Sequence, residues 1–145
     1  MKKLLFSILL TAIAFSLGAC TDGKPIGFDQ LPQNAQTTIK NYFNKEEVLL
    51  VTIDKDNLLT EYEVKLKDST ELEFDRNGNL IKIDSQQKKV PDGLIPEKAL
   101  AYVNANYPDA FITEWGKDDL RWKAELNNSL KLVFNNGGEF IRYDD

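Results

Sequence analysis

The chain has 145 residues and a formal net charge of −5, with 18 lysines and arginines, 23 aspartates and glutamates, no histidine and one cysteine. The acidic balance argues against binding to a nucleic-acid phosphate backbone, which requires clustered cations. The missing histidine excludes Ser–His and Cys–His nucleophile pairs and every His-ligated metal site, and the single cysteine excludes an intramolecular disulfide.

The N-terminal segment 1–19 has the order of a secretory signal. Lys2 and Lys3 precede an apolar run over 4–15. That run is too short to cross a bilayer comfortably, because a spanning helix needs about 20 apolar residues. It ends in the sequence LGAC at 17–20, which resembles the bacterial lipobox. The resemblance implies cleavage before Cys20, lipid on its thiol and a mature protein anchored to the cell envelope, on the periplasmic or the cell-surface side.

Beyond a polar tether the sequence contains two copies of one repeat. From Tyr62 onward the two copies align without a gap, so that Tyr62 matches Trp122 and Phe74 matches Phe134. Before Tyr62 the two copies also match, at offsets slightly longer than the 60 residues that separate Tyr62 from Trp122. The predicted organisation is a signal peptide over 1–19, a tether over 20–27, a first repeat over 28–85, a linker over 86–93 and a second repeat over 94–145.

Each repeat opens with a helical pattern. Ala35, Ile39 and Phe43 recur at a spacing that places them on one face of a helix, after Pro32, a residue suited to the first helical position. The second copy shows the same pattern over 99–107 and stops before a proline.

After each helix the period becomes two, which is typical of strands with one buried and one solvated face. Asn77-Gly78 lies between two alternating runs and predicts a tight hairpin turn, because such turns need positive φ. A duplicate turn is predicted near Asn136-Gly137. The predicted strands are 48–54, 60–67, 70–75, 79–84, 110–115, 120–126, 129–134 and 139–143.

These patterns predict an α+β fold of two tandem repeats. Each repeat is a helix packed on a four-stranded antiparallel β-meander, and the two sheets join in one curved surface.

The motifs together resemble the bacterial PepSY-like lipoproteins. The motifs are the export signal, L-P-x-x-A at 31–35, Y-x-V-x-L at 62–66, E-x-E-F-D-x-x-G at 71–78, and a second copy with L-x-L-x-F at 130–134 and G-x-F at 138–140. The resemblance covers 28–144. It implies tandem units similar to the β-lactamase-inhibitor-protein fold, and non-catalytic binding of extracytoplasmic enzymes such as peptidases or β-lactamases. No inhibitor contact residues carry over, and the secreted inhibitor's disulfides have no counterpart here.

We expect no enzyme activity, no cofactor and no metal site. Asp118 and Asp119 lie between predicted strands, where a polar turn explains them. Asp75 to Asn79 is superficially similar to a calcium loop, but its glycine is fourth instead of sixth. A hairpin turn explains this segment better.

The polar face of the sheet is the predicted binding surface, because complementary charges steer and select protein partners. Trp115 is the candidate aromatic anchor, although its alignment with Ile53 also fits a core position. The predicted partner-binding residues are Glu61, Glu63, Lys65, Glu73, Trp115, Arg121, Lys123 and Arg142.

The sequence therefore predicts a non-catalytic envelope lipoprotein that binds an extracytoplasmic protein, such as a peptidase or other hydrolase, with inhibition as one outcome. Its predicted partners are that extracytoplasmic protein, in the periplasm or at the cell surface, and the membrane, through the lipid on Cys20. The alternative is small-ligand sensing or capture between the repeats, which a largely apolar pocket with a few polar groups would favour. A third interpretation is a purely structural envelope component. The oligomeric state stays open.

Overall fold

The computed structural model describes residues 23–55 and 59–144, so the predicted signal and the lipid site at Cys20 lie outside the described residues. Within them the chain forms two α-helices, α1 (Gln33–Tyr42) and α2 (Glu97–Asn106). The strands are β1 (Lys24–Pro25), β2 (Val48–Lys55), β3 (Thr60–Leu66), β4 (Glu71–Asp75), β5 (Leu80–Asp84), β6 (Ile112–Asp118), β7 (Arg121–Leu126), β8 (Lys131–Phe134) and β9 (Phe140–Tyr143). None of the described helices is long and apolar enough to cross a membrane.

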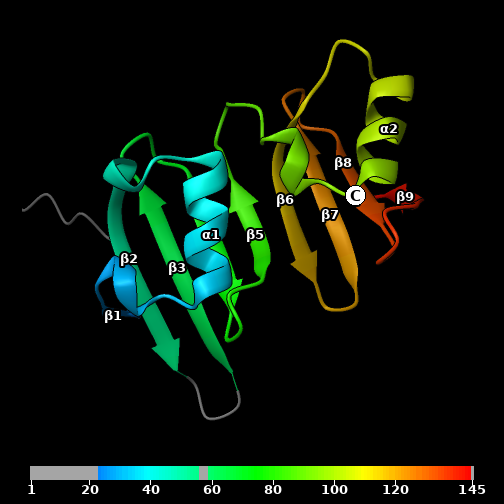
Figure 1. Cartoon of the computed structure of the whole chain (residues 1–145). Helices are drawn as coiled ribbons and strands as arrows, with labels where there is room; N and C mark the ends of the chain where they lie inside the picture. The colour runs from blue at the N-terminus through cyan, green and yellow to red at the C-terminus, as the bar shows by residue number, and fades with distance from the viewer. Residues whose placement is uncertain (1–22, 56–58, 145) are drawn as a thin grey trace, which may run out of the picture.

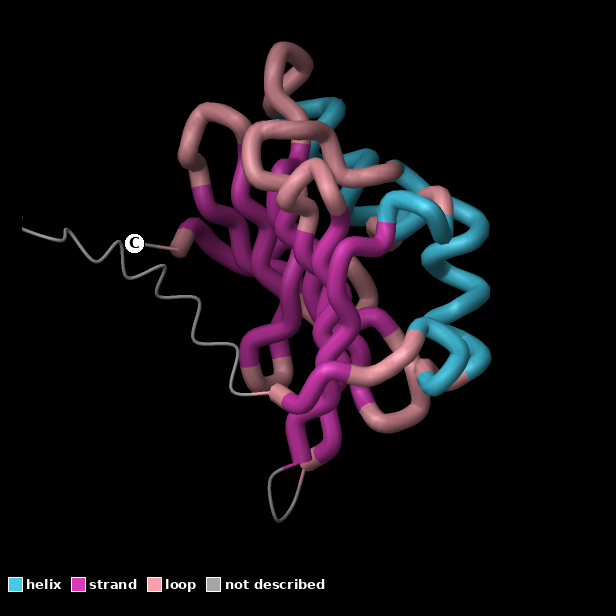
Figure 2. The backbone as a smooth tube through the Cα atoms, turned by 90° about the vertical axis from the view of Figure 1, so that its left-hand side faces the viewer, coloured by secondary structure: helices cyan, strands magenta, loops and turns pink. Residues whose placement is uncertain are grey.

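The nine strands form one antiparallel sheet whose spatial order follows the chain from β1 to β9. Both helices lie on the same side of this sheet, as Figures 1 and 2 show, and in the described part of the chain no element covers the other face. The predicted α+β class is confirmed.

The two repeats match each other in detail. α1 and α2 have the same length, and each is followed by a four-stranded run of the sheet, β2 to β5 and β6 to β9. The last hairpin of each repeat has a register shift at the same place, at Glu73/Phe74 and at Val133/Phe134. Positive φ angles also recur at equivalent positions, Ser69 and Ser129. The repeated sequence therefore produces repeated irregularities as well as repeated strands.

The repeated hairpin turn packs against the start of the helix in its own repeat. Gly78 and Gly138 have φ angles of +80° and +79°. A Cβ atom on Gly78 would lie 2.8 Å from Cβ of Pro32, and one on Gly138 would lie 3.0 Å from Cβ of Pro96. Both glycines are therefore needed for the backbone conformation and for the close approach. The sequence points to Gly137 for the second turn, but the positive φ lies at Gly138.

One apolar core joins the two repeats. Ile39 of α1 and Val103 of α2 belong to a single cluster with the inward-facing residues of the sheet. The repeats also share the sheet, because β5 pairs with β6 through Ile83 and Trp115 and their two neighbours on each strand. Burial of this common core is the main stabilising contribution that the chain offers, since a disulfide is excluded.

Three segments differ from the sequence-based expectations. Lys24–Pro25, placed in the predicted tether, pairs with β2 as an extra edge strand, so the sheet has nine strands rather than eight. Val90, in the predicted polar linker, is 1% exposed and belongs to the core. β6 continues beyond the predicted strand end, through Gly116 to Asp118, because Asp118 pairs with Arg121 of β7.

Candidate functional site

The face of the sheet opposite the helices carries polar side chains in rows that cross the strands. The central row runs from β2 to β9 and contains Thr52, Glu63, Glu73, Lys82, Gly116, Lys123, Val133 and Arg142. A second row contains Lys65, Glu71, Asp84, Glu114, Glu125 and Lys131. These positions alternate with the core residues of each strand, so their side chains point away from the helices. We call the surface made by these rows, together with Glu61, Asp118 and Arg121, the open face.

The two repeats carry opposite charges at four pairs of equivalent positions of the open face. The equivalent pairs are Glu61 and Arg121, Glu63 and Lys123, Lys65 and Glu125, and Glu71 and Lys131. A face that is merely solvated needs polar side chains but no particular sign of charge. The inversion leaves strands β3 and β4 mainly acidic and strands β7 to β9 richer in cations.

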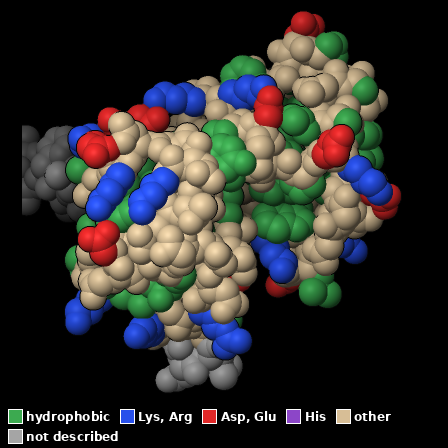
Figure 3. Space-filling model, viewed as in Figure 1, with side chains coloured by type: hydrophobic (Ala, Val, Ile, Leu, Met, Phe, Trp, Pro, Cys, Tyr) green, Lys and Arg blue, Asp and Glu red, His purple; other side chains and the backbone are tan. Residues whose placement is uncertain are grey.

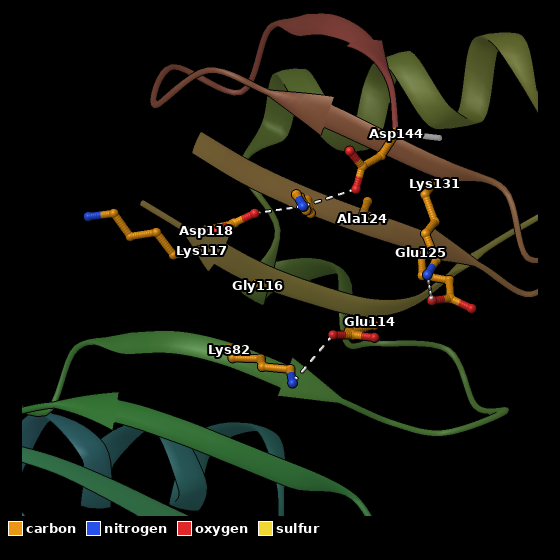
Figure 4. Close-up of a pocket in the computed structure, with 10 residues that line it drawn as sticks. Lys82, Glu114, Gly116, Lys117, Asp118, Ala124, Glu125, Lys131 and Asp144 are labelled. Carbon is orange, nitrogen blue, oxygen red and sulfur yellow. Dashed lines mark ion pairs between the residues drawn. The ribbon is translucent and has the colours of Figure 1, made fainter. Parts of the chain in front are cut away.

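An open groove of about 280 Å³ lies on this face where the two repeats join. Gly116 lacks a side chain, and the groove lies over it between Lys82 of β5 and Lys123 of β7. Figure 4 shows Lys82 and Glu114 at one side of this groove, and Asp118 and Asp144 at the other. Nearly all of the side chains that line the groove are charged.

Two lysines each bridge two carboxylates on the open face. Lys82 Nζ lies 3.8 Å from Glu73 Oε1 and 3.5 Å from Glu114 Oε1, so it links three strands. Lys123 Nζ lies 2.6 Å from Asp118 Oδ2 and 3.0 Å from Asp144 Oδ2. Such exposed pairs contribute little to stability individually, but they fix the positions of the charges.

Glu73 is a carboxylate of this face whose charged form its surroundings disfavour. Burial raises the pKa of Glu73, and the neighbouring Glu61, Glu63 and Glu71 raise it further, while Lys82 offsets part of the effect. Glu63 lies directly opposite Glu73 in the strand register. Like charges in directly opposed positions destabilise a sheet, so the acidic half of the open face is kept at a cost in stability.

Seven of the eight predicted binding residues lie together on the open face. They are Glu61, Glu63, Lys65, Glu73, Arg121, Lys123 and Arg142. The exception is Trp115, whose side chain is 1% exposed and packs in the core.

Trp115 is therefore corrected from binding anchor to core residue. Its ring stacks on Trp122 with centroids 5.3 Å apart, on the helix side of the sheet. The strand register also assigns Trp115 a different equivalent residue in the first repeat. Trp115 opposes Ala124 as Val51 opposes Val64, so its counterpart is Val51 and not Ile53.

Sequence reasoning missed the part that Lys82 and Gly116 play. The alternating pattern of its strand places Lys82 on the polar face, but its ion pairs with Glu73 and Glu114 depend on β4 and β6 lying on either side of β5. The groove over Gly116 could not be predicted from the local sequence, because it depends on the pairing of β5 with β6 across the linker.

The helix-bearing side has a different character. Figure 3 shows charged side chains scattered among apolar and neutral ones on that side. A cavity of about 270 Å³ lies there between α2 and the segments that precede and follow it, lined largely by apolar side chains such as Val90, Leu100 and Phe111. Its lining residues belong to the linker and to the second repeat, and none of them belongs to the first repeat.

The hairpin turn at Asp75 is stabilised by hydrogen bonds from residues of the same turn to the Asp75 carboxylate. Asp75 Oδ1 accepts hydrogen bonds from the backbone N–H groups of Asn77 and Asn79, at 2.8 and 2.9 Å, and Oδ2 accepts one from Asn79 Nδ2 at 2.9 Å. Asn135 Oδ1 accepts the two equivalent backbone hydrogen bonds in the second repeat. Among the described residues no group of three or more Cys, Asp or Glu side chains is placed to hold a metal ion.

Comparison with known proteins agrees with this architecture. The model of the PepSY-like family, proposed to be β-lactamase-inhibitor-like, matches the chain twice, over residues 20–82 and 60–142. A search of curated proteins found no match.

Solved structures from Bacteroides are similar over nearly the whole fold. A proposed calcium-regulated periplasmic protein of Bacteroides thetaiotaomicron is 35% identical, with a TM-score of 0.80, covering 86% of this chain and 98% of its own. A proposed periplasmic protein of Bacteroides vulgatus, from the DUF2874 family, is 31% identical with a TM-score of 0.80, covering 87% and 99%. The two matched segments and this extensive similarity lead to one conclusion: the chain belongs to the PepSY-like family.

Proposed function

We propose that the protein is a non-catalytic, lipid-anchored component of the bacterial cell envelope that binds an extracytoplasmic protein through its open face. The inversion of charge between equivalent positions of the two repeats is the observation that carries this proposal. A partner with the complementary arrangement would meet opposite charges on both halves of the face, which favours one orientation over others.

The similar structures support the compartment in this proposal. They are of proposed periplasmic proteins, and the lipobox at 17–20 would place the mature chain on the same side of the membrane. The β-lactamase-inhibitor-like description of the family supports a protein, such as a peptidase or other hydrolase, as the partner class.

Small-ligand capture between the repeats receives less support. The groove at the junction of the repeats is open and lined mainly by charged side chains. Small-molecule sites are mostly apolar with a few converging polar groups. A protein surface fits this groove better than a small ligand does.

The test exchanges the charges without changing the net charge. The variant carries Glu61→Arg, Glu63→Lys, Arg121→Glu and Lys123→Glu, so at two of the four inverted pairs each repeat receives the charges of the other. The bait is the chain from residue 20 with Cys20→Ser, which contains the whole described fold. The control variant, Lys40→Glu with Glu97→Lys, exchanges two exposed charges on the helices and also keeps the net charge.

Proteins captured from solubilised envelope by the wild type would be identified, purified and titrated against all three forms. We expect the exchange variant to bind at least about tenfold more weakly, and the control to bind as the wild type does. Circular dichroism and denaturant midpoints would verify that both variants are folded. Equal affinity of all three forms would contradict the proposal.

A further inference from the structure

A second hollow on the open face lies at the outer end of the second repeat, between the β6–β7 turn and β9. Its volume is about 350 Å³. It is lined by Leu120, Val133, Arg121, Lys123 and Arg142, together with Asp118 and Asp119. We call it the outer pocket. It contains three of the predicted binding residues.

The outer pocket has an apolar floor where the first repeat has a carboxylate. Val133 takes the place of Glu73 of the first repeat and is 0% exposed, although it lies in the polar row of the sheet. Leu120 in the turn above is 79% exposed, the highest value of the large apolar side chains in the described residues. An isolated exposed leucine is ordinary, but here it flanks a hollow in which no carboxylate occupies the position equivalent to Glu73.

Cations surround this floor, and one of them makes no ion pair with any residue that the structure describes. Lys123 is paired with Asp118 and Asp144, and Arg142 NH1 lies 3.3 Å from Asp144 Oδ1. Arg121 forms no such pair within the described ranges. Asp118, Asp119 and Asp144 match the three cations in number, but Asp118 and Asp144 are the acids that pair with Lys123 and Arg142. The guanidinium of Arg121 therefore stays available to a partner.

From these observations we infer that the outer pocket is the anchor point of the open face, and that it takes a carboxylate side chain with a neighbouring apolar side chain from an acidic protein segment. The carboxylate pairs with Arg121, whose planar guanidinium suits bidentate contact, and the apolar group packs on the exposed side chain of Leu120. The inference rests on the proposed function, because it specifies the chemistry of the partner at one part of the same face.

Charge and shape favour this occupant over others. The equivalent positions in the first repeat are Glu61, Glu63 and Glu73, so an acidic segment is repelled there and attracted at the second repeat. An anion without an apolar part would leave the exposed side chain of Leu120 uncovered, which gives up the apolar burial that this pocket offers.

The test uses a blocked peptide in which two glutamates lie between leucines. One matched peptide has glutamines in place of the glutamates, and another has alanines in place of the leucines. Binding to the chain from residue 20 with Cys20→Ser would be followed by NMR of the valine and leucine methyl groups. Arg121→Gln and Leu120→Ser are the test variants. Arg76→Gln is the matched control, because Arg76 is an exposed arginine in the hairpin turn of the first repeat.

We expect the glutamate peptide to shift the methyl signals of Val133 and Leu120, with Arg121→Gln weakening binding about tenfold and Arg76→Gln changing it less than twofold. Both matched peptides should bind several-fold more weakly, and Leu120→Ser should weaken binding of the glutamate peptide. The inference is overturned if the peptide does not bind, if the glutamine peptide binds equally well, or if Arg121→Gln and Arg76→Gln behave alike.

The two proposals can fail separately. If the binding of an envelope protein depends on the open face but Arg121→Gln does not weaken that binding, the assignment of the outer pocket as anchor is wrong and the proposed function stands. If the peptide binds at the outer pocket but no envelope protein distinguishes the charge-exchange variant from the wild type, the proposed function falls.

Discussion

At the scale of single residues, two glycines connect the repeated hairpins to the repeated helices. Gly78 and Gly138 combine positive φ with close contact to the proline that precedes each helix. The protein therefore uses the same turn twice because each turn is a packing surface for the start of a helix as well as a reversal of the chain.

Replacing either glycine by alanine should destabilise the protein. We expect Gly78→Ala and Gly138→Ala each to lower the free energy of unfolding by about 1–3 kcal/mol, because a Cβ atom is strained at positive φ and meets the proline. Gly137→Ala is the control, since Gly137 is not among the positive-φ residues and Asn77 occupies the equivalent position. Denaturant unfolding measures all three, and equal losses at 137 and 138 would contradict this account.

The carboxylate of Asp75 should add a pH-dependent contribution at one turn only. Burial alone would raise the pKa of Asp75, but hydrogen bonds from Asn79 and Asn77 outweigh it and lower the pKa. Because its folded pKa is depressed, Asp75 stabilises the fold above its unfolded pKa of about 3.9, and this contribution is lost as the pH falls through the folded value.

Asp75→Asn tests this contribution, because Asn135 already accepts the equivalent hydrogen bonds in the second repeat. At pH 7 we expect Asp75→Asn to cost less than Asp75→Ala, which should cost about 1 kcal/mol through the lost acceptors. The stability difference between wild type and Asp75→Asn should shrink as the pH falls from 5 towards 2. A difference that stays constant over that range would show that the carboxylate charge has no part in the turn.

At the scale of elements, strands β3 and β4 place two glutamates face to face. Glu63 opposes Glu73, and burial together with neighbouring glutamates raises the pKa of Glu73. An acid whose folded pKa is raised stabilises the fold only while it is protonated, so this contribution is lost as the pH rises through the folded value.

Removing that charge should stabilise the protein at neutral pH. We expect Glu73→Gln to raise the free energy of unfolding at pH 7 by up to about 1 kcal/mol, because Glu73 is partly exposed and solvent screens the repulsion. The gain should disappear near pH 3, where the wild-type side chain is protonated. Urea unfolding at both pH values measures it, and a gain of equal size at both would rule out charge repulsion as its cause.

The helices and most strands were predictable from the sequence because their signals are local. The spacing of Ala35 and Ile39 lies within one helix, and alternation as in Tyr62 and Val64 lies within one strand. The exceptions depend on pairing with distant segments. Lys24–Pro25 becomes a strand only because β2 lies beside it, and β6 extends to Asp118 only because β7 pairs with it.

At the scale of the whole molecule, the shared sheet and shared core predict one cooperative unit. Both tryptophans, Trp115 and Trp122, lie in the second repeat. A destabilising change in the first repeat should therefore be detected by their fluorescence, because the repeats are joined through β5, β6 and one apolar cluster.

Gly78→Ala provides this test. We expect its unfolding midpoint by tryptophan fluorescence to shift by the same amount as its midpoint by far-ultraviolet circular dichroism, as two-state unfolding requires. If the fluorescence midpoint stays at the wild-type value while the circular dichroism midpoint moves, the repeats unfold independently.

The sequence by itself determined the duplication, the helix and strand types, and seven of the side chains on the open face. These follow from periodicity and from the alignment of the two copies, which are properties of the chain order. Only the tertiary structure decided that Trp115 is buried, that Gly116 opens a groove at the junction, and that Leu120, Val133 and Arg121 meet in one pocket. Those features arise from register between strands and from the turns that join them, and one residue of register moves a side chain to the opposite face.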